Sequence, residues 1–235
     1  MHASMCGRFT LTASAQRLRE RFALAAAPEP EPPRYNIAPT QPVLVIPNRD
    51  TRLLRPARWG LIPSWAKEAK AGNAMINARA ESVATRAPFR DALARHRCLI
   101  PADGFYEWQR DGRVRRPFYF QLRDRQPLAF AGLWGLWRSR GGETIVSCTI
   151  ITAPANALLR PIHDRMPVIL HPDAWQAWLD PQALPPAELM PLLTTAPDDW
   201  LDGVEVSPRV NSAANDGPEC IAPLEPGGER TDVAG

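Results

Sequence analysis

Short apolar runs, rather than long helical faces, dominate the hydrophobic pattern of the chain. Several runs rich in β-branched and aromatic residues are bounded by Gly, Pro or polar clusters, a pattern typical of strands. The predicted strands are Val43–Pro47, Arg52–Trp59, Arg97–Pro101, Phe118–Leu122, Leu128–Leu136, Thr144–Ile151 and Val204–Pro208. The sequence contains neither an internal repeat nor a βαβ rhythm, which argues against a doubly wound sheet. The pattern predicts one α+β domain on a mostly antiparallel sheet with short helices around it.

Helical periodicity is restricted to short windows. From Ser14 to Ala26, the residues Leu18, Phe22 and Leu24 share a face, which predicts an amphipathic helix. Further short helices are predicted at Ala87–Arg95, Pro172–Leu179 and Pro186–Leu193. The last two begin with a proline, which is well tolerated in the first turn of a helix.

The ends of the predicted domain are marked by composition. The segment Ala27–Pro33 is too rich in proline for a helix or a sheet, so we expect an extended connector there. The segment Glu225–Gly235 has no apolar anchor and is expected to be disordered. We therefore expect a single domain over residues 5–222, a tail over residues 223–235 and a short N-terminal extension over residues 1–4.

Composition places the chain among ordinary globular proteins. Of its 235 residues, 45% are hydrophobic, and eight Trp and seven Phe can fill a core, so a disordered, collagenous or disulfide-stapled chain is excluded. Its 28 Lys and Arg against 25 Asp and Glu leave a net charge of +3, which does not require a polyanionic partner but allows a local basic patch. Only Lys67 and Lys70 are lysines, and this excess of arginine, beside 26 Pro and many Ala, is typical of genome composition. Arginine can also bind phosphate with its planar two-pronged group.

Several classes of protein are made improbable by missing signals. No apolar window reaches the roughly 20 residues of a membrane helix, and the first residues lack the pattern of a signal peptide. The four cysteines show no Cys-x-x-Cys spacing, and the four histidines form no metal-ligand cluster. A phosphate-binding glycine loop is also lacking. We expect a location in the reducing cytoplasm, without a cofactor, metal or membrane partner.

Cys6 has an unusual position, because it directly follows Met5 in the sequence MCGRFT. If translation starts at Met5, removal of that methionine leaves Cys6 with a free α-amine beside its thiol. These groups titrate at about 7.7–8.0 and 8.5, so both have a reactive fraction at neutral pH. Such a pair can trap an aldehyde twice, first as an imine and then as a five-membered thiazolidine. The alternative is a small buried cysteine, the role we expect for Cys98, Cys148 and Cys220.

Three other residues have side chains suited to proton transfer or positioning. Glu107 lies between aromatic residues in GFYEW, where burial raises the pKa of a carboxyl group toward the range useful for acid–base catalysis. His163, in PIHDRMP, has an imidazole that is easily tuned to neutral pH. Asn36, in YNIAPT, can donate and accept hydrogen bonds at a reacting centre. The alternatives are a salt-bridged carboxylate, a loop histidine and a turn asparagine.

Arginines next to aromatic residues indicate single-stranded nucleic acid as a partner. Arg8, Arg79 and Arg165 can bind backbone phosphates, and exposed aromatic rings can stack on bases. We expect such rings in the segment Arg58–Trp65, above all Trp65, which follows Pro63-Ser64 in an irregular stretch. Salt bridges and core packing are the alternatives for each of these residues.

Eight segments together resemble the SRAP family, the abasic-site processing proteins of bacteria and their eukaryotic relatives. They are MCGRFT, RYNIAPTQ, RWGLIPSW, INARAES, RCLIPADGFYEW, AGLW, TIITAPAN and IHDRMPVIL, and they occur in family order over roughly residues 5–222. The resemblance implies a single domain with a curved, partly barrel-like β core and flanking helices.

The resemblance also implies a role in the DNA damage (SOS) response, for which we expect a monomer near the nucleoid. Members of the family bind single-stranded DNA that contains an abasic site and attach covalently to the open-chain deoxyribose aldehyde. Mapped onto this sequence, Cys6 supplies both nucleophiles and Asn36 positions it. Glu107 moves protons during imine formation and reversal, and His163 helps to open the sugar ring.

The remaining implied residues bind DNA. The positions that correspond to backbone-binding residues are Arg8, Asn77, Arg79 and Arg165. Pro39 and Trp65 map close to the point where the DNA is bent, although the length of the family's loop varies around Trp65.

One departure from the family pattern concerns the start of the chain, MHASMCGRF. If the residues before Cys6 remain, Cys6 has no α-amine, and its thiol forms only a reversible hemithioacetal. We expect residues 1–4 to be a start-site or cloning artefact with Met5 as the initiator, and self-cleavage before Cys6 is a second route.

Two other functions fit part of the pattern. Cys, His, Glu and Asn together also outline a thiol peptidase that acts on itself or on other proteins. A peptidase needs the thiol but tolerates a blocked amine, whereas a thiazolidine requires both groups. The other function is a non-covalent single-strand binding module, which would keep its affinity for undamaged DNA after loss of Cys6.

Overall fold

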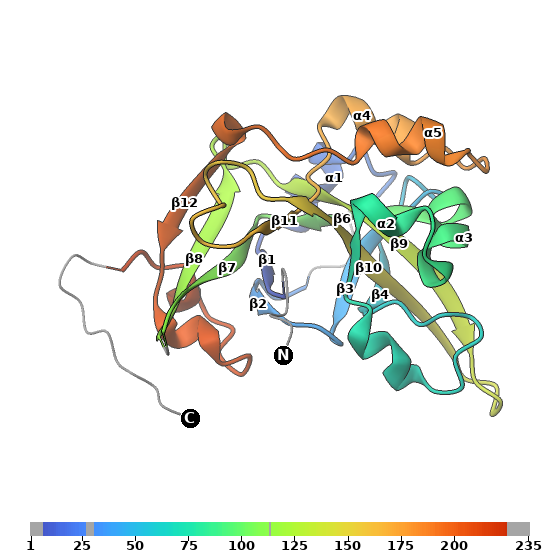
Figure 1. Cartoon of the computed structure of the whole chain (residues 1–235), viewed down its shortest axis with the longest axis horizontal. Helices are drawn as coiled ribbons and strands as arrows, with labels where there is room; N and C mark the ends of the chain where they lie inside the picture. The colour runs from blue at the N-terminus through green and yellow to red at the C-terminus, as the bar shows by residue number, and fades with distance from the viewer. Residues whose placement is uncertain (1–6, 27–30, 113, 225–235) are drawn as a thin grey trace.

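The computed structural model describes residues 7–26, 31–112 and 114–224. Two β layers face each other in it, and helices cover the outer side of one of them (Figure 1). The prediction of an α+β domain with a partly barrel-like, mostly antiparallel β core is confirmed. Cys6, the first part of the predicted connector and the segment from Glu225 onward lie outside the described residues.

Five strands close into a small barrel, because each is hydrogen-bonded to two neighbours in the ring β3–β4–β10–β9–β6. The bounds of these strands are Pro42–Pro47 for β3, Arg55–Trp59 for β4, Arg97–Ala102 for β6, Leu128–Arg138 for β9 and Thr144–Pro154 for β10. Beyond the barrel, β10 also pairs with β5 (Asn77–Arg79) and β11 (Arg165–Pro167). The β4–β10 and β5–β10 pairings are parallel, and the other pairings are antiparallel.

The second layer is a five-stranded antiparallel sheet in the order β12-β8-β7-β1-β2. Its strands are β1 (Phe9–Leu11), β2 (Arg34–Ile37), β7 (Gly104–Asp111), β8 (Val114–Leu122) and β12 (Leu201–Glu205). The chain passes from the barrel to this sheet where β6 leads into β7. At that point Asp103 accepts hydrogen bonds from the hydroxyl of Thr12 (2.9 Å) and the main-chain N–H of Ala13 (3.1 Å), which fixes the end of β1 against the link.

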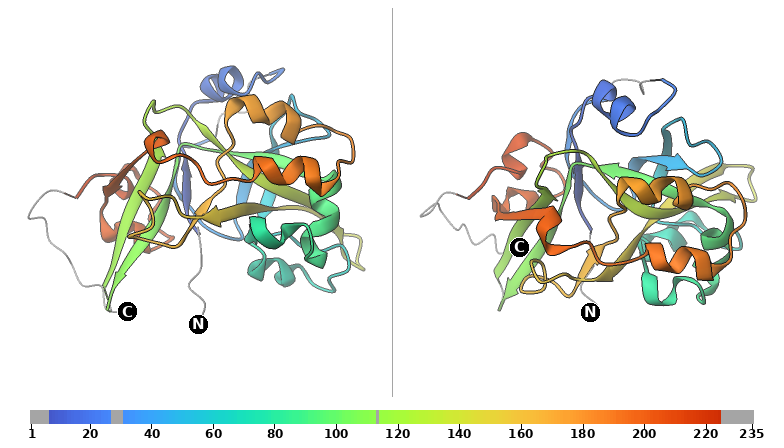
Figure 2. Two further views of the ribbon diagram at one scale, coloured as in Figure 1. Left: turned by 45° about the horizontal axis from the view of Figure 1, so that its top comes forward. Right: turned by 90° about the horizontal axis from the view of Figure 1, so that it is seen from above.

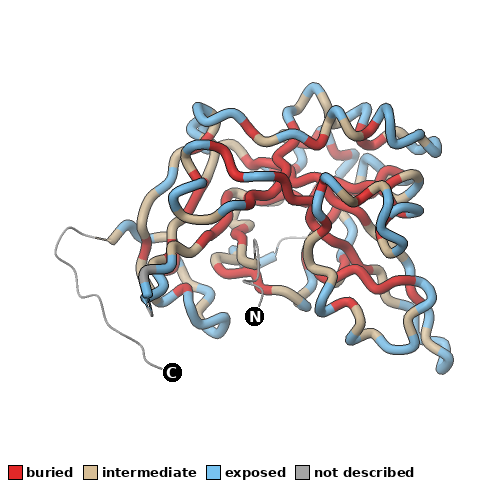
Figure 3. The backbone as a smooth tube through the Cα atoms, in the orientation of Figure 1, coloured by how far each residue is buried: buried red, intermediate tan, exposed pale blue. Residues whose placement is uncertain are grey.

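Aromatic side chains join the two layers. The ring of Phe9 on β1 lies 5.1 Å from Trp59 of β4 and 5.8 Å from Phe130 of β9, both edge-on. Phe105 of β7 also lies edge-on to Phe130, at 6.0 Å. All four rings are at most 2% exposed, and burying each contributes roughly 1.5–3 kcal/mol. Figure 3 shows that the residues in the middle of the molecule, where the two layers meet, are largely buried.

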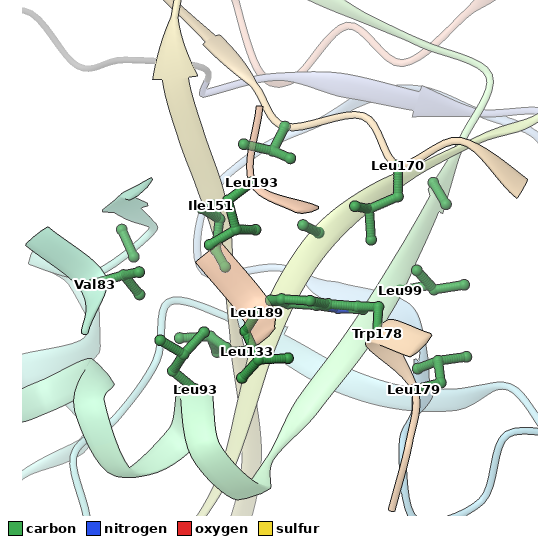
Figure 4. Close-up of a cluster of buried hydrophobic side chains, with 14 of the residues drawn as sticks. Val83, Leu93, Leu99, Leu133, Ile151, Leu170, Trp178, Leu179, Leu189 and Leu193 are labelled. Atoms are coloured by element: carbon green, nitrogen blue, oxygen red, sulfur yellow. The ribbon is translucent and has the colours of Figure 1, made fainter. Parts of the chain in front are cut away.

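The helices cover the outer face of the barrel. They are α1 (Ala15–Arg21), α2 (Ala80–Val83), α3 (Ala87–Arg95), α4 (Pro172–Trp178) and α5 (Pro186–Leu189). Trp178, Leu189 and Leu93 from three of these helices pack on Leu99 and Leu133 of the barrel (Figure 4). The two rotated views show the helices on the barrel side, away from β7, β8 and β12 (Figure 2).

The structure confirms most of the predicted elements and corrects others. The helix Ala87–Arg95 has its predicted bounds, whereas the first helix ends at Arg21 and the last becomes a 3₁₀ turn after Leu189. The strands β1, β2, β5, β7 and β11 were not predicted. The described chain also extends through Leu224, whose N–H donates to the carbonyl oxygen of Glu205, two residues beyond the predicted domain.

Candidate functional site

Three neighbouring strands bring predicted site residues together beside the N-terminal segment. β1 lies between β2 and β7, pairing antiparallel with both, and Arg8 directly precedes β1. Asn36 lies on β2 and Glu107 on β7. Residues that are far apart in the sequence therefore lie on the two strands that flank β1, next to Arg8.

Asn36 is a fully engaged side chain. It is 1% exposed, and its Oδ1 accepts a hydrogen bond from Arg8 (2.8 Å). Its Nδ2 donates to the carbonyl oxygens of Val210, Ser212 and Asn215, at 3.2, 2.9 and 2.7 Å. An amide with these contacts holds other groups in place, and contact with a substrate would require breaking this network.

Arg8 is fixed by the same network. One terminal nitrogen donates to Asn36 and to the carbonyl oxygen of Val210 (2.9 Å), and its guanidinium lies 5.9 Å from the centre of the Trp108 ring. Arg115 lies over the same ring at 5.4 Å. Burial, and next the positive charge of Arg115, lower the pKa of Arg8 from its usual value. Two like charges near one ring make this position attractive to an anion.

Glu107 is a buried carboxyl group, 1% exposed, on β7. The register pairs Phe9 with Phe105 and Thr10 with Gly104, and the N–H of Tyr106 donates to the carbonyl oxygen of Arg8 (3.0 Å). Side chains alternate along a strand, so Glu107 points to the opposite side of the sheet from Trp108. Glu107 is therefore a buried carboxyl group on the strand that pairs with β1, one residue beyond the hydrogen bond to Arg8.

His163 lies on a loop that contacts the same strand. Gln109, two residues after Glu107 and on the same face, donates to the carbonyl oxygen of Pro161 (3.2 Å). The main-chain N–H of Arg165 donates to Nδ1 of His163 (3.0 Å). Oδ1 of Asp164 lies 3.2 Å from the same Nδ1. Two neighbouring groups of the loop therefore fix the orientation of the imidazole ring.

Three of the four predicted phosphate-binding residues, Asn77, Arg79 and Arg165, lie on strands that pair with β10. β5 pairs Asn77 with Ile150 and Arg79 with Thr152, and β11 pairs with the end of the same strand. Arg79 is exposed and Asn77 is half-buried.

Arg165, by contrast, is buried and makes a two-pronged pair with Glu81. It also donates to the carbonyl oxygen of Thr152 (2.7 Å). The hydrogen bonds from Arg165 lower the pKa of the Glu81 carboxyl group below its usual value. In the described structure, Arg165 is therefore held by a protein carboxylate.

Pro39 and Trp65 lie on neighbouring turns. Pro39 is in the turn between β2 and β3, and the N–H of Thr40 in that turn donates to the carbonyl oxygen of Trp59 (2.9 Å). The loop with Trp65 begins directly after Trp59, with Gly60 at a φ of 126°. A Cβ at Gly60 would lie 2.6 Å from the carbonyl oxygen of Gly72, so this close backbone approach requires glycine.

Trp65 is 67% exposed, as predicted. The ring nitrogen of Trp137 donates to the carbonyl oxygen of Ala66 (2.8 Å), which holds the turn that presents Trp65. Trp59 does not fit the expectation of exposed aromatic residues in this segment. It is fully buried, because its ring packs on Phe9 and its Nε1 donates to the carbonyl oxygen of Ile76 (2.9 Å).

The three cysteines that the structure describes are buried, as expected for them. Cys98, Cys148 and Cys220 are buried free thiols. Burial raises the pKa of the Cys98 and Cys148 thiols well above the usual value, which makes them poor nucleophiles. Cys6 precedes the described residues.

Three residues with a place in this arrangement were missed from the sequence. Trp108 carries both Arg8 and Arg115 on its ring, Glu81 pairs with Arg165, and Asp216 contacts β2. Trp108 and Glu81 lie in FYEW and INARAES, within segments that carry the family resemblance. The sequence alone does not reveal which residues they contact.

Two negative findings concern the described residues only. They contain no group of three or more His, Cys, Asp or Glu side chains arranged to bind a metal ion. None of their helices combines the length and the apolar character needed to cross a bilayer.

The fold has close counterparts among solved structures. A protein from Bacteroides thetaiotaomicron superimposes with a TM-score of 0.84 over 93% of this chain and all of its own, at 24% identity. A protein from Bordetella bronchiseptica superimposes with a TM-score of 0.74 over 86% of this chain and all of its own, at 31% identity.

The sequence comparison identifies the family. The family model described as "SOS response associated peptidase (SRAP)" matches residues 5–213. Abasic site processing protein YoqW of Bacillus subtilis (strain 168) is 44% identical over 221 residues, which cover 92% of this chain and 99% of YoqW. Abasic site processing protein YedK of Escherichia coli (strain K12) is 34% identical over 231 residues, which cover 94% of this chain and all of YedK. The chain belongs to the SRAP family, as its motifs predicted.

Proposed function

We propose that this protein processes abasic sites in single-stranded DNA by forming a thiazolidine crosslink through Cys6. The observation that carries the proposal is the place of Glu107, a buried carboxyl group on β7, the strand that pairs with β1 and whose Tyr106 N–H donates to the carbonyl oxygen of Arg8. The names of YoqW and YedK, both abasic site processing proteins, support the same substrate.

The proposed reaction starts with an open-chain sugar and a free α-amine on Cys6. The amine attacks the C1′ aldehyde, and the resulting carbinolamine loses one water to form an imine. The thiol then adds to the imine carbon, so that a C–S bond forms and the proton of the thiol ends on nitrogen. The net change is loss of one water. Ring closure is intramolecular and therefore strongly favoured over attack by a separate thiol.

In this proposal, three side chains assist the reaction of Cys6. Glu107 exchanges protons during loss of water and during reversal, and His163 assists the opening of the sugar ring. Such general acid–base help is typically worth about 10²–10⁴-fold in rate. Asn36 positions the N-terminal segment through its hydrogen bond with Arg8.

The DNA backbone would pass along the arginines on both sides of β10. Arg8, Asn77, Arg79 and Arg165 bind phosphates in this proposal, and Arg165 exchanges Glu81 for a phosphate. Pro39 and the exposed ring of Trp65 lie where the strand bends, and stacking on such a ring is worth about 1–3 kcal/mol per base.

A thiol peptidase is the second candidate, favoured by the family's description as a peptidase. Here the thiolate of Cys6 attacks a peptide carbonyl, with His163 as the general base. This reaction does not use the α-amine.

The test compares protein that begins at Cys6 with protein that retains Met1–Met5, each incubated with single-stranded DNA that carries an abasic site. The Cys6-first protein is expected to give an adduct that survives denaturation without borohydride, and the extended protein is not. Cys6→Ser should lose the stable adduct while a borohydride-trapped imine remains. A stable adduct from Cys6→Ser would contradict the thiazolidine. Equal peptide cleavage by both forms, without any adduct, would favour the peptidase.

A further inference from the structure

A loop near the C-terminal end of the described chain closes against β2. Its ends meet where Val206 forms a bridge with Pro223, and the N–H of Ser207 donates to the carbonyl oxygen of Ala222 (3.3 Å). We call residues 207–222 the closing loop. Val210 and Cys220, inside the loop, are fully buried against β7 and β8, so the loop is packed rather than loosely attached.

Asp216 is the polar anchor of the closing loop. Its Oδ1 accepts hydrogen bonds from the N–H groups of Tyr35 (2.6 Å) and Asn36 (2.7 Å), and its Oδ2 accepts one from Arg34 Nε (2.8 Å). A carboxylate that accepts from two main-chain N–H groups and a guanidinium makes strong, charge-assisted bonds.

A bulge in β2 explains how one oxygen reaches two successive N–H groups. β1 pairs Phe9 with Ile37 and Leu11 with Arg34, so three steps along β2 oppose two along β1. In a regular strand, neighbouring N–H groups point in opposite directions, whereas the extra residue of a bulge re-aims part of the chain. β2 is also the edge strand of its sheet, so Asp216 accepts hydrogen bonds from main-chain N–H groups that a neighbouring strand would otherwise bind.

The closing loop reaches the predicted site through three connections. Three of its carbonyl oxygens accept hydrogen bonds from Asn36 Nδ2. The carbonyl oxygens of Val210 (2.9 Å) and Asn211 (3.5 Å) accept hydrogen bonds from Arg8. Arg34, paired with Asp216, also donates to Gln41 Oε1 (2.5 Å), which accepts from the N–H of Ala38 (3.0 Å). This last connection holds the turn that contains Pro39.

We infer that the closing loop is a positioning element for the N-terminal segment and that Asp216 is its positioning residue. The inference rests on the proposed function, because the positioned group is the nucleophile at Cys6. Asp216 touches neither DNA nor the reacting atoms in this scheme. It acts through β2 and Asn36, which hold Arg8, and Arg8 is two residues from Cys6.

The experiment compares Asp216→Ala, Asp216→Asn and Asp202→Ala in protein that begins at Cys6. Asp202 is the matched control, because it is likewise an aspartate in an ion pair with arginine, here Arg123 and Arg125 (both 3.2 Å), but lies on β12 at the other end of the sheet. Three quantities are measured: amide hydrogen exchange at Tyr35 and Asn36, the single-turnover rate of adduct formation at saturating abasic DNA, and the affinity for undamaged single-stranded DNA.

For Asp216→Ala we expect faster exchange at Tyr35 and Asn36 and an adduct rate lowered about 10-fold or more, because a 1 Å displacement of a reacting group costs about 10²-fold. The affinity for undamaged DNA should change less than about 3-fold, since Arg8 is one of several phosphate contacts. Asp216→Asn keeps an acceptor oxygen and should restore the rate to within about 3-fold, and Asp202→Ala should behave as wild type.

Faster exchange in Asp216→Ala with a wild-type adduct rate would overturn the inference, as would unchanged exchange. If wild-type protein forms no adduct, the proposed function fails, and exchange at the two amides still decides whether Asp216 holds β2. If Asp216→Ala does not fold, Arg34→Ala removes one contact of the same carboxylate and is judged by the same criteria.

Discussion

Two buried arginines, Arg97 on a barrel strand and Arg165 on the adjoining strand β11, have opposite kinds of partner. Arg97 on β6 is fully buried, and its three guanidinium nitrogens donate to five main-chain carbonyl oxygens. Arg165 on β11 is 7% exposed, and its charge is matched by Glu81, whose side chain is 51% exposed. Its Nε is buried, and no described residue accepts a hydrogen bond from it.

The partners of Arg97 are the ends of helices. Leu93 and Ala94 belong to the last turns of α3, Trp178 ends α4, and Asp180 and Gln182 follow it. The last carbonyl groups of a helix have no partner within the helix and carry partial negative charge. Arg97 therefore neutralises two helix ends at once, and all of its donors are used inside the protein.

The comparison shows which buried charge is available for binding. Exchanging the partners of Arg97 would expose several carbonyl groups, whereas exchanging Glu81 for a phosphate leaves a carboxylate that is already half in water. We therefore expect Arg97 to determine stability and Arg165 to determine affinity for DNA.

The largest expected effect is on stability, from Arg97→Met. The substitution keeps apolar volume but removes the donor of the two fully buried bonds, to the carbonyl oxygens of Trp178 and Leu93. At about 1–3 kcal/mol for each buried acceptor left without a donor, the free energy of unfolding should fall by about 2–6 kcal/mol. Urea denaturation should show a lower midpoint at an unchanged slope. The exposed Arg95 on α3 is the control, since Arg95→Met should change stability by about 0.5 kcal/mol or less. A loss below about 1 kcal/mol for Arg97→Met would contradict the interpretation.

Arg165→Met should lower the affinity for single-stranded DNA and have a smaller effect on stability than Arg97→Met. We expect a loss of about 1–2 kcal/mol in the free energy of unfolding, because Glu81 returns to water when its partner is removed. Affinity for single-stranded DNA should fall, and the slope of log affinity against log salt should flatten by about 0.7 for one lost phosphate contact.

Arg79→Met, at an exposed position, should give the same change of slope with stability unchanged. Wild-type salt dependence in Arg165→Met would make Arg165 a structural residue like Arg97.

The sequence predicts the barrel better than the sheet that carries Glu107. The barrel strands contain β-branched runs such as Val43–Pro47, whereas β7 reads GFYEWQRD, and Phe105, Tyr106 and Glu107 are buried in succession. Because both faces of β7 are covered there, the alternation that marks a strand is lost. The three-residue strands β5 and β11 exist through pairing with β10, which local pattern cannot reveal.

The site shows the same division. Glu107 and His163 were selected by their chemistry, and Trp65 by its irregular surroundings. Their partners were not predictable, since Glu81 is 84 residues from Arg165 and Asp216 is 180 from Asn36. Arg97 and Arg165 look alike in sequence, because the groups that distinguish them come from other elements.

The smallest expected effect sharpens the comparison by releasing Arg165 from its partner. Glu81→Gln removes the competing charge, and an ion pair with one exposed member is worth about 0.2–1 kcal/mol. Affinity for single-stranded DNA should therefore rise by up to about 5-fold, measured by titration at fixed salt. Glu188, in the first turn of α5 as Glu81 is in the first turn of α2, is the matched control, and Glu188→Gln should leave affinity unchanged.

Glu81→Gln should also change how the stability of the protein depends on pH. Hydrogen bonds from Arg165 hold the pKa of Glu81 below its unfolded value of about 4.3, so the folded state binds this proton less readily than the unfolded state. The stability that Glu81 contributes is therefore fully present above about pH 4.3 and is lost as pH falls through the lower folded pKa. In Glu81→Gln this part of the acid loss should vanish, so unfolding free energy should fall less steeply below about pH 4.3. Identical acid profiles and identical DNA affinities for Glu81→Gln and wild type would show that Glu81 does not control Arg165.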